Sequence, residues 1–220
     1  VLIKNGQVLV EDVPAPLVEK GTLLVRVDHS CISSGTELQG LKTSGLPLWQ
    51  RALRQPDHVR KVFQTAVHHG FRYTYNLVSG KLRAGSVTGY SAAGIVLEAG
   101  PGVTDFKPGD RVACAGAQCA HHAEIIRTPR NLAVPVPAET SLSEASTVAL
   151  GAIALQGIRR LGPTLGETFV VIGLGIIGQL TCQMLRINGC SVIGVDLNPE
   201  RVALALKNGL DFGINASGRD

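Results

Sequence analysis

Aromatic residues and long apolar runs are the two clearest absences in this chain of 220 residues. Aromatic side chains make up 4% of the composition. No apolar run reaches the ~18–20 residues that a membrane-spanning helix needs, so we expect no membrane partner. The chain also lacks basic stretches interleaved with aromatics and any nucleic-acid-binding motif, so nucleic acid is not expected as a ligand.

Cysteine is present in an odd number, five, without the spacing of a disulfide framework. Lys4 is followed by polar residues, whereas a secretory signal would continue into an apolar stretch. Both observations favour reduced thiols and predict cytoplasmic localisation. The chain starts at Val1 and ends soon after one half of a dinucleotide fold, so we expect it to be a fragment of a longer protein.

Glycine is abundant, with 26 residues, and proline follows with 11. These residues punctuate short apolar runs in two regions, residues 1–36 and 86–137. Frequent short strands separated by Gly/Pro turns are typical of a barrel or a sandwich. The candidate strands are residues 23–27, 92–98, 111–115 and 123–126.

The segment between these regions, residues 38–84, has helical periodicity instead. Asp57 follows Pro56 as a candidate helix cap. Apolar residues then recur on one helical face at Val59, Val62, Phe63, Ala66 and Val67. The segment has a net charge of +7, while the remainder of the chain has −3. Its basic residues are Lys42, Arg51, Arg54, Arg60, Lys61, Arg72, Lys81 and Arg83.

A bridging helix is expected within residues 138–162. Ser143 suits its start, and Gly162-Pro163 suits its end. The apolar face of this helix would be Ala145, Val148, Ala149, Ile153 and Leu155. The bridge therefore divides the chain into residues 1–142 and 143–220.

The most informative stretch is residues 168–196. An apolar β-branched run leads into a glycine-rich turn, a helical pattern and a second apolar run that ends on Asp196. The first glycine of the turn permits a tight bend, the second lets a pyrophosphate approach the backbone, and the third lets helix and strand pack closely. The sequence thus predicts a dinucleotide site at Gly173, Leu174, Gly175, Ile176, Ile177 and Gly178.

Asp196 lies 18 residues past Gly178, at the expected end of the second strand. A carboxylate at this place binds ribose hydroxyls and repels a 2′-phosphate. The predicted cofactor is therefore NAD rather than NADP.

Three further motifs resemble those of the medium-chain dehydrogenase/reductase superfamily. Residues 100–112 (GPGVTDFKPGDRV) resemble its G-x-G-V-x-x-F-x-x-G-D-R-V turn and strand, and residues 34–37 (SGTE) resemble its C-G-T-D segment. Residues 89–91 (GYS) take the place of its G-H-E. The resemblance implies a GroES-like short-strand barrel over residues 1–142, with the insert 38–84. Residues 143–220 would then hold the bridging helix and the first half of a Rossmann doubly wound parallel sheet.

A closer resemblance is carried by the insert and by residues 147–167 (TVALGAIALQGIRRLGPTLGE). These residues are similar to the amino-terminal part of bi-domain oxidoreductases found with bacterial polysaccharide genes. That resemblance implies a second oxidoreductase module and a role in polysaccharide biosynthesis.

The positions of the family's catalytic zinc ligands hold different chemistry in this chain. Ser34 stands at the cysteine position, and Tyr90 and Ser91 stand at the His and Glu positions. A neutral hydroxyl and a phenol are poor zinc ligands, so we expect no metal. Cys114, Cys119, His121 and His122 form the one alternative cluster, but on a strand His121 and His122 would point to opposite faces. Core thiols and surface imidazoles are the expected roles of these four residues.

Without zinc, the substrate carbonyl needs hydrogen-bond donors to polarise it. Ser34, Thr36 and Tyr90 are the candidate donors, and Glu37 is the candidate orienter or proton acceptor. Structural turn roles for Thr36 and Glu37 and a core role for Tyr90 stay open.

These residues predict a zinc-independent, NAD(H)-dependent oxidoreductase that resembles alcohol dehydrogenases. It would transfer hydride between nicotinamide and an alcohol or carbonyl substrate, with an anionic sugar derivative as one candidate attracted by the basic insert. A homodimer is one assembly that we consider. The alternative is a non-catalytic dinucleotide-binding module or scaffold within a larger bi-domain protein, a reading favoured by the loss of the zinc ligands.

Overall fold

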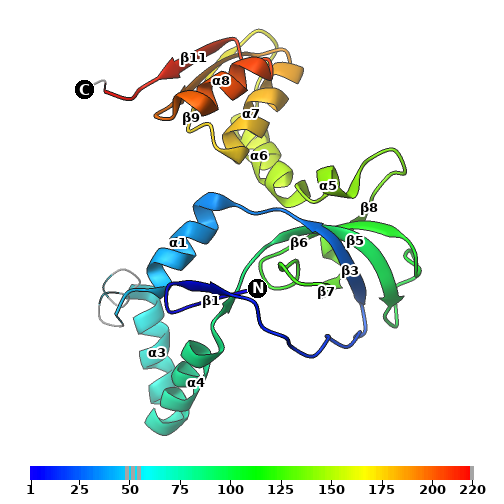
Figure 1. Ribbon diagram of the computed structural model, residues 1–220, viewed down its shortest axis with the longest axis vertical. Helices are drawn as coiled ribbons and strands as arrows, with labels where there is room; N and C mark the ends of the chain where they lie inside the picture. Colours follow the sequence, from blue (N-terminus) through cyan, green and yellow to red (C-terminus); the bar gives the residue numbers. More distant parts are fainter. Residues whose placement is uncertain (48–49, 51–52, 54–55, 219–220) are drawn as a thin grey trace. The chain divides into compact units, whose positions relative to one another are not determined.

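The computed structural model describes residues 1–47, 50, 53 and 56–218 (Figure 1). The chain forms two compact units, Val1–Ser146 and Thr147–Asp220. Within the described residues, no helix has both the length and the apolar character to cross a bilayer. Several charged residues of the basic insert lie outside the described residues or have side chains outside them: Arg51, Arg54, Asp57, Lys61, Lys81 and Arg83.

The first unit is built on a curled five-stranded antiparallel sheet in the order β7-β3-β5-β6-β8 (Figure 1). Its strands are β3 (Thr22–Ser30), β5 (Ser91–Ala99), β6 (Arg111–Ala115), β7 (Ile125–Pro129) and β8 (Ala133–Pro135), with the 3₁₀ turn η1 (Arg130–Leu132) before β8. Alternate side chains point inward, as the two-residue period of strands requires. The buried cluster includes Leu23, Val25, Ala92, Val96, Val112, Cys114 and Ile126.

The predicted strands of this sheet are largely confirmed. The bounds of β6 coincide with residues 111–115, and β3 and β5 contain the predicted runs. The fourth prediction, residues 123–126, is displaced, because β7 begins only at Ile125. His121 and His122 therefore lie in the loop before β7, and the expectation that a strand would point them to opposite faces was wrong.

A smaller sheet and three helices complete most of this unit. The sheet has the order β2-β1-β4, with β1 (Leu2–Lys4), β2 (Gln7–Leu9) and β4 (Ser86–Val87). The insert is helical, as predicted, and contains α3 (Pro56–His69) and α4 (Phe71–Ala84), which pack side by side (Figure 1). It also contains most of α1 (Ser34–Ser44).

The apolar face predicted for residues 59–67 does not form a core. Only Ala66 is buried, whereas Phe63 and Val67 are 66% and 67% exposed. Helical periodicity predicted the helix correctly, but periodicity alone does not state what a helical face packs against.

The bridge consists of two helices instead of one. The short helix α5 (Leu142–Ala145) starts at Ser141, whose hydroxyl accepts from the amide of Glu144 while the Glu144 side chain accepts from the Ser141 amide. The expected start at Ser143 was therefore wrong by two residues. The second helix, α6 (Val148–Leu161), belongs to the second unit and ends at Gly162 with φ 61°, as predicted.

The second unit is a three-stranded parallel sheet, order β11-β10-β9, with helices between its strands. Its elements after α6 are β9 (Thr168–Ile172), α7 (Ile176–Ile187), β10 (Ser191–Asp196), α8 (Pro199–Lys207) and β11 (Phe212–Asn215). Leu174, Leu185, Val192 and Leu210 are among the buried residues of its core. This is the strand-helix-strand pattern predicted for residues 168–196.

Candidate functional site

The glycine-rich turn of the second unit has the geometry that a dinucleotide requires. Gly173 has φ +91°, a conformation that residues with a Cβ rarely adopt. A Cβ on Gly178 would lie 1.9 Å from the carbonyl oxygen of Gly173, so no side chain fits there. Gly175 caps α7, and a Cβ on it would meet no atom within 4 Å. The helix N-terminus is therefore open to a phosphate.

Asp196 ends β10 beside this turn. One carboxylate oxygen accepts from the Leu174 amide at 2.6 Å, and the other accepts from the Asn198 amide at 2.7 Å. These hydrogen bonds from the Asn198 and Leu174 amides hold the pKa of Asp196 below its ordinary value. Arg201 lies 3.8 Å from the same carboxylate. Asp196 is thus an anion that both supports the turn and faces the adjacent pocket.

Gln179 is a supporting residue that the sequence analysis missed. Its side-chain amide donates to the carbonyls of Leu174, at 3.2 Å, and of Arg201, at 2.9 Å. Gln179 thereby connects the glycine-rich turn to α8 by hydrogen bonds. A polar residue one position after Gly178 on an apolar helix was the available signal.

A pocket of about 900 Å³ opens at the carboxyl ends of the parallel strands. It is lined by Ile172, Gly173, Val195, Asp196, Leu197, Asn198, Pro199, Glu200, Arg201 and Ala216. Ligands of open α/β sheets bind at this edge. The turn, the helix N-terminus and the carboxylate are the features that the phosphates and a ribose of a dinucleotide require.

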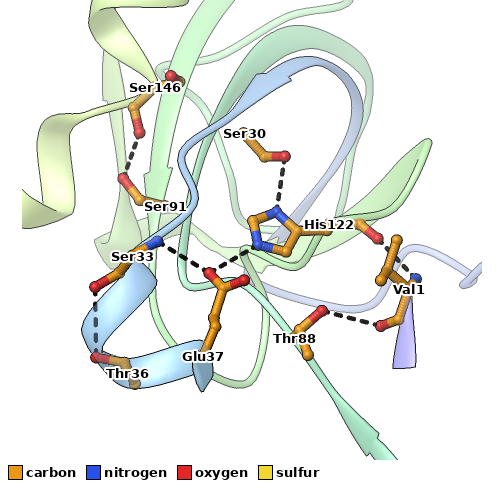
Figure 2. A network of polar contacts seen from close by, with 9 residues as sticks. All are labelled: Val1, Ser30, Ser33, Thr36, Glu37, Thr88, Ser91, His122 and Ser146. Carbon is orange, nitrogen blue, oxygen red and sulfur yellow. Dashed lines mark hydrogen bonds and ion pairs between the residues drawn. The ribbon is translucent and has the colours of Figure 1, made fainter. Parts of the chain in front are cut away.

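A second polar cluster lies in the first unit, around His122 (Figure 2). Nδ1 of His122 lies 2.8 Å from the Ser30 hydroxyl, and Nε2 lies 3.1 Å from a carboxylate oxygen of Glu37. The Ser33 amide donates to the same Glu37 oxygen at 3.0 Å. The side chains of His122 and Glu37 are 10% and 20% exposed. The cluster joins β3, α1 and the loop before β7.

Close backbone contact places His122 in this cluster. Its amide donates to the Thr88 carbonyl at 2.9 Å. Gly89 has φ +92°, and a Cβ there would lie 2.6 Å from the backbone nitrogen of His122. Only glycine therefore lets the two loops approach so closely. Surface exposure was the expected role of His122, and the structure shows that this was wrong.

Two pockets of the first unit share Ile3, Glu37 and Thr88. The larger, about 470 Å³, is lined by Val1, Ile3, Val8, Ser30, Ile32, Ser34, Glu37, Leu38, Leu41, Thr88 and His122. The smaller, about 220 Å³, is lined by Ile3, Thr36, Glu37, Gly40, Ser44, Ser86, Val87, Thr88, Gly89, Tyr90 and Ala117. The four predicted catalytic residues are thus distributed over two neighbouring pockets: Ser34 in the first, Thr36 and Tyr90 in the second, and Glu37 in both.

The positions that correspond to zinc ligands are used differently here. Ser91 is fully buried, and its hydroxyl donates to the Ser146 carbonyl at 2.5 Å (Figure 2). Ser34 and Tyr90 line different pockets. Among the described residues, no group of three His, Cys, Asp or Glu side chains is placed to hold a metal ion.

The alternative cluster of cysteines and histidines has other partners. The Cys119 thiol donates to the Ala115 carbonyl at 3.4 Å. Cys114 is buried, and burial raises the pKa of its thiol to about 11. His122 points to Ser30 and Glu37 instead. All five cysteines are free thiols.

Comparison with known proteins gives a match to the alcohol dehydrogenase GroES-like domain over residues 61–153. The chain is 33% identical over 143 residues to the D-guloside 3-dehydrogenase of Escherichia coli, covering 64% of the chain and 39% of that protein. It is 27% identical over 157 residues to an alcohol dehydrogenase of Geobacillus stearothermophilus, covering 59% of the chain and 47% of that enzyme. The chain thus spans less than half the length of these relatives.

Solved structures show the same fold. The quinone oxidoreductase of Coxiella burnetii superposes with a TM-score of 0.74 at 18% identity, covering the whole chain and 61% of that enzyme. The Escherichia coli quinone oxidoreductase complexed with NADPH gives 0.69 at 24% identity, covering 96% of the chain and 55% of that enzyme. The chain therefore combines a GroES-like domain with a Rossmann-like parallel sheet, and its homologues are oxidoreductases of the medium-chain dehydrogenase/reductase family.

Proposed function

We propose that the intact protein is a zinc-independent, NAD(H)-dependent oxidoreductase that acts on an alcohol or carbonyl substrate. The observation that carries the proposal is the pocket lined by Gly173 and Asp196, because Gly173 begins the glycine-rich turn that leads to the N-terminus of α7 and Asp196 supports that turn. When bound there, the dinucleotide supplies the hydride donor or acceptor. The oxidoreductase homologues support the reaction class.

The choice of NAD over NADP rests on Asp196. Its lowered pKa keeps the carboxylate ionised at neutral pH, so a 2′-phosphate beside it would be repelled. Arg201 offsets part of this repulsion, but it is half exposed, and solvent screens its charge. The Escherichia coli quinone oxidoreductase binds NADPH, and we infer the opposite preference for this chain from Asp196.

Zinc independence rests on ligand chemistry. Ser34 and Tyr90 carry neutral hydroxyls, and the Ser91 hydroxyl is committed to the Ser146 carbonyl. Zinc prefers thiolate, imidazole and carboxylate ligands. Polarisation of the carbonyl therefore falls to hydrogen-bond donors, for which Ser34, Thr36 and Tyr90 are the candidates. Glu37 would orient the substrate or accept its proton.

A sugar derivative is one candidate substrate, and the similarity to D-guloside 3-dehydrogenase supports that candidate. The proposal that this sugar derivative is anionic is supported by the positive charge of the insert, residues 38–84. Lys42, Arg60 and Arg72 line neither of these two pockets of the first unit, so these cations would attract an anion from a distance.

Four further points stay predictions: the role in polysaccharide biosynthesis, the second oxidoreductase module, the homodimer and the cytoplasmic localisation.

Turnover by the intact protein tests the proposal. Purified protein would be assayed for NADH oxidation with aldehydes, ketones and sugar derivatives, and its zinc content would be measured. We expect turnover with less than stoichiometric zinc. No turnover with any substrate class would favour a non-catalytic dinucleotide-binding module. One zinc per chain that is lost in Ser34→Ala would contradict zinc independence.

A further inference from the structure

We propose that Ser30, His122 and Glu37 form a proton relay, and that the 470 Å³ pocket beside them binds a substrate with an apolar body and one hydroxyl or carbonyl group. This inference rests on the proposed function and narrows its substrate class. It adds His122 and Ser30, neither of which the sequence motifs point to.

The hydrogen bonds fix the direction of the relay. A carboxylate only accepts hydrogen bonds, so Nε2 of His122 carries the proton that Glu37 accepts at 3.1 Å. Nδ1 of the neutral ring is then an acceptor, and the Ser30 hydroxyl 2.8 Å away is its donor. The hydrogen-bonded series Ser30–His122–Glu37 can therefore receive a proton at the Ser30 oxygen (Figure 2). The Ser33 amide holds Glu37 in place at 3.0 Å.

The pocket beside the relay has a strongly uneven lining. Its apolar residues are Val1, Ile3, Val8, Ile32, Leu38 and Leu41, and its polar residues include the three relay members. Val8, Ile32 and Leu38 are 57%, 67% and 53% exposed, so their apolar side chains are accessible to a ligand in this pocket. The volume lies within the range of small-molecule sites, roughly 300–1,000 Å³. The apolar residues would contact the body of an apolar alcohol or carbonyl compound, and the relay residues would contact its one polar group; a polyhydroxylated sugar would place further hydroxyls against the apolar side chains.

The proton balance of the step is simple. In the oxidation direction, the substrate hydroxyl gives its proton to the Ser30 oxygen while the Ser30 proton passes to Nδ1 of His122. The nicotinamide cofactor of the proposed function would supply the hydride acceptor: it would take the hydrogen with the C–H electron pair, and the C–O bond would become a carbonyl. The resulting imidazolium is stabilised by the Glu37 carboxylate at Nε2. Reduction is the reverse, with His122 as the acid.

Few other ionisable groups surround the pair. His121 is adjacent to His122 in sequence, and burial lowers the pKa of its imidazole. Cys31 lies near Glu37; burial and the Glu37 charge raise the pKa of its thiol, which stays neutral. Glu37 is therefore the charged side chain in hydrogen-bond contact with the His122 ring.

A binding experiment tests the pocket independently of turnover. The intact protein, labelled with ¹³C in its histidine rings, would be titrated with cyclohexanol and with methyl α-D-glucopyranoside. The His122 signal is assigned by its loss in His122→Gln. We expect cyclohexanol to shift this signal saturably and the glucoside not to shift it. No shift with cyclohexanol, or an equal shift of the His29 signal, would overturn the pocket assignment.

Kinetics test the relay. We expect His122→Gln to lower kcat for alcohol oxidation by about 10²-fold, with little change in KM. The pH profile of kcat should also differ between the wild-type protein and His122→Gln, because the variant has no imidazole to take the proton from Ser30. Glu37→Gln should also lower kcat, because the imidazolium formed in the step loses its anion. A His122→Gln enzyme with wild-type kcat and pH profile overturns the relay.

His29→Gln is the matched control. His29 lies on β3 next to Ser30 and pairs with Asp28 at 2.7 Å, but it is half exposed and lines neither pocket. Its replacement should leave kcat unchanged. Retained NADH binding and an unchanged unfolding temperature show that His122→Gln is folded. If the wild-type protein turns over no substrate, the proposed function and the relay fail together, while the cyclohexanol titration still decides the pocket.

Discussion

The proposed nucleotide pocket of the second unit and the His122 pocket of the first unit are held together in different ways. In the proposed nucleotide pocket, Asp196 accepts hydrogen bonds from the backbone amides of Leu174 and Asn198, and the positive φ of Gly173 shapes the turn. In the His122 pocket, the contacts join side chains that are 85 and 92 positions apart in sequence: His122 with Glu37, and His122 with Ser30. A site built on local backbone geometry depends on a few glycines, whereas a site built on distant side chains depends on the whole packed sheet.

The largest expected effect is the loss of the nucleotide site in Gly178→Ala. The added Cβ would lie 1.9 Å from the backbone oxygen of Gly173, which cannot move without opening the turn. We expect dinucleotide binding to be abolished and the second unit to be destabilised by about 3 kcal/mol, the upper end for an overpacked site. Calorimetric titration with NADH and thermal unfolding measure both effects.

The control for this substitution is Gly157→Ala on α6, where a Cβ meets no atom within 4 Å. That change should stabilise the helix by about 0.5–1 kcal/mol. Normal NADH affinity in Gly178→Ala would show that close packing at this glycine is not required for the site.

Cofactor discrimination is the next effect in size. The intact protein should bind NADH more tightly than NADPH by about 2–3 kcal/mol, since a 2′-phosphate would meet the Asp196 carboxylate. Asp196→Asn keeps one acceptor oxygen and removes the negative charge, so the difference in binding free energy between NADH and NADPH should become smaller. Titration of both proteins with both cofactors measures it. Equal affinities in the wild-type protein would refute the role given to Asp196.

A stability difference of about 1–3 kcal/mol is expected for Glu37→Ala, because the Ser33 amide and the His122 ring both lose their acceptor. Glu37→Gln keeps an acceptor and should cost less. Asp28→Ala breaks the exposed pair with His29 and should cost at most about 1 kcal/mol. Denaturant unfolding of the three variants measures the free energy of unfolding that each one loses. Equal losses in Glu37→Ala and Asp28→Ala would mean that the His122 cluster contributes no more than a surface pair.

The smallest effect concerns acid stability. The pKa of Asp196 is lowered by amide hydrogen bonds, so its contribution to stability is fully present above the pKa of the unfolded chain, about 3.9. It is lost as the pH falls through the lower folded value. Wild-type stability minus that of Asp196→Asn should therefore shrink as the pH decreases below about 4. A difference that is constant with pH would contradict this assignment.

The local structure of the proposed nucleotide site could be predicted from the sequence because its parts are neighbours along the chain. The strand ending at Ile172, the turn, α7 and Asp196 all lie where residues 168–196 indicated. The His122 cluster could not be predicted, because nothing near His122 indicates Ser30 or Glu37 as its partners. The apolar side chains of α3 show the same limit, since their periodicity predicted a helix but not their exposure.

The transfer of deuterium from [4,4-²H₂]NADH, which carries deuterium at both C4 positions, tests the central claim most directly. Intact protein freed of metal by a chelator would be incubated with the labelled cofactor and its best carbonyl substrate, and the product would be analysed by mass spectrometry. The account predicts one deuterium on the carbinol carbon of the product, formed at an undiminished rate after chelation. A product without deuterium, or turnover that disappears with the chelator and returns with Zn²⁺, would contradict it.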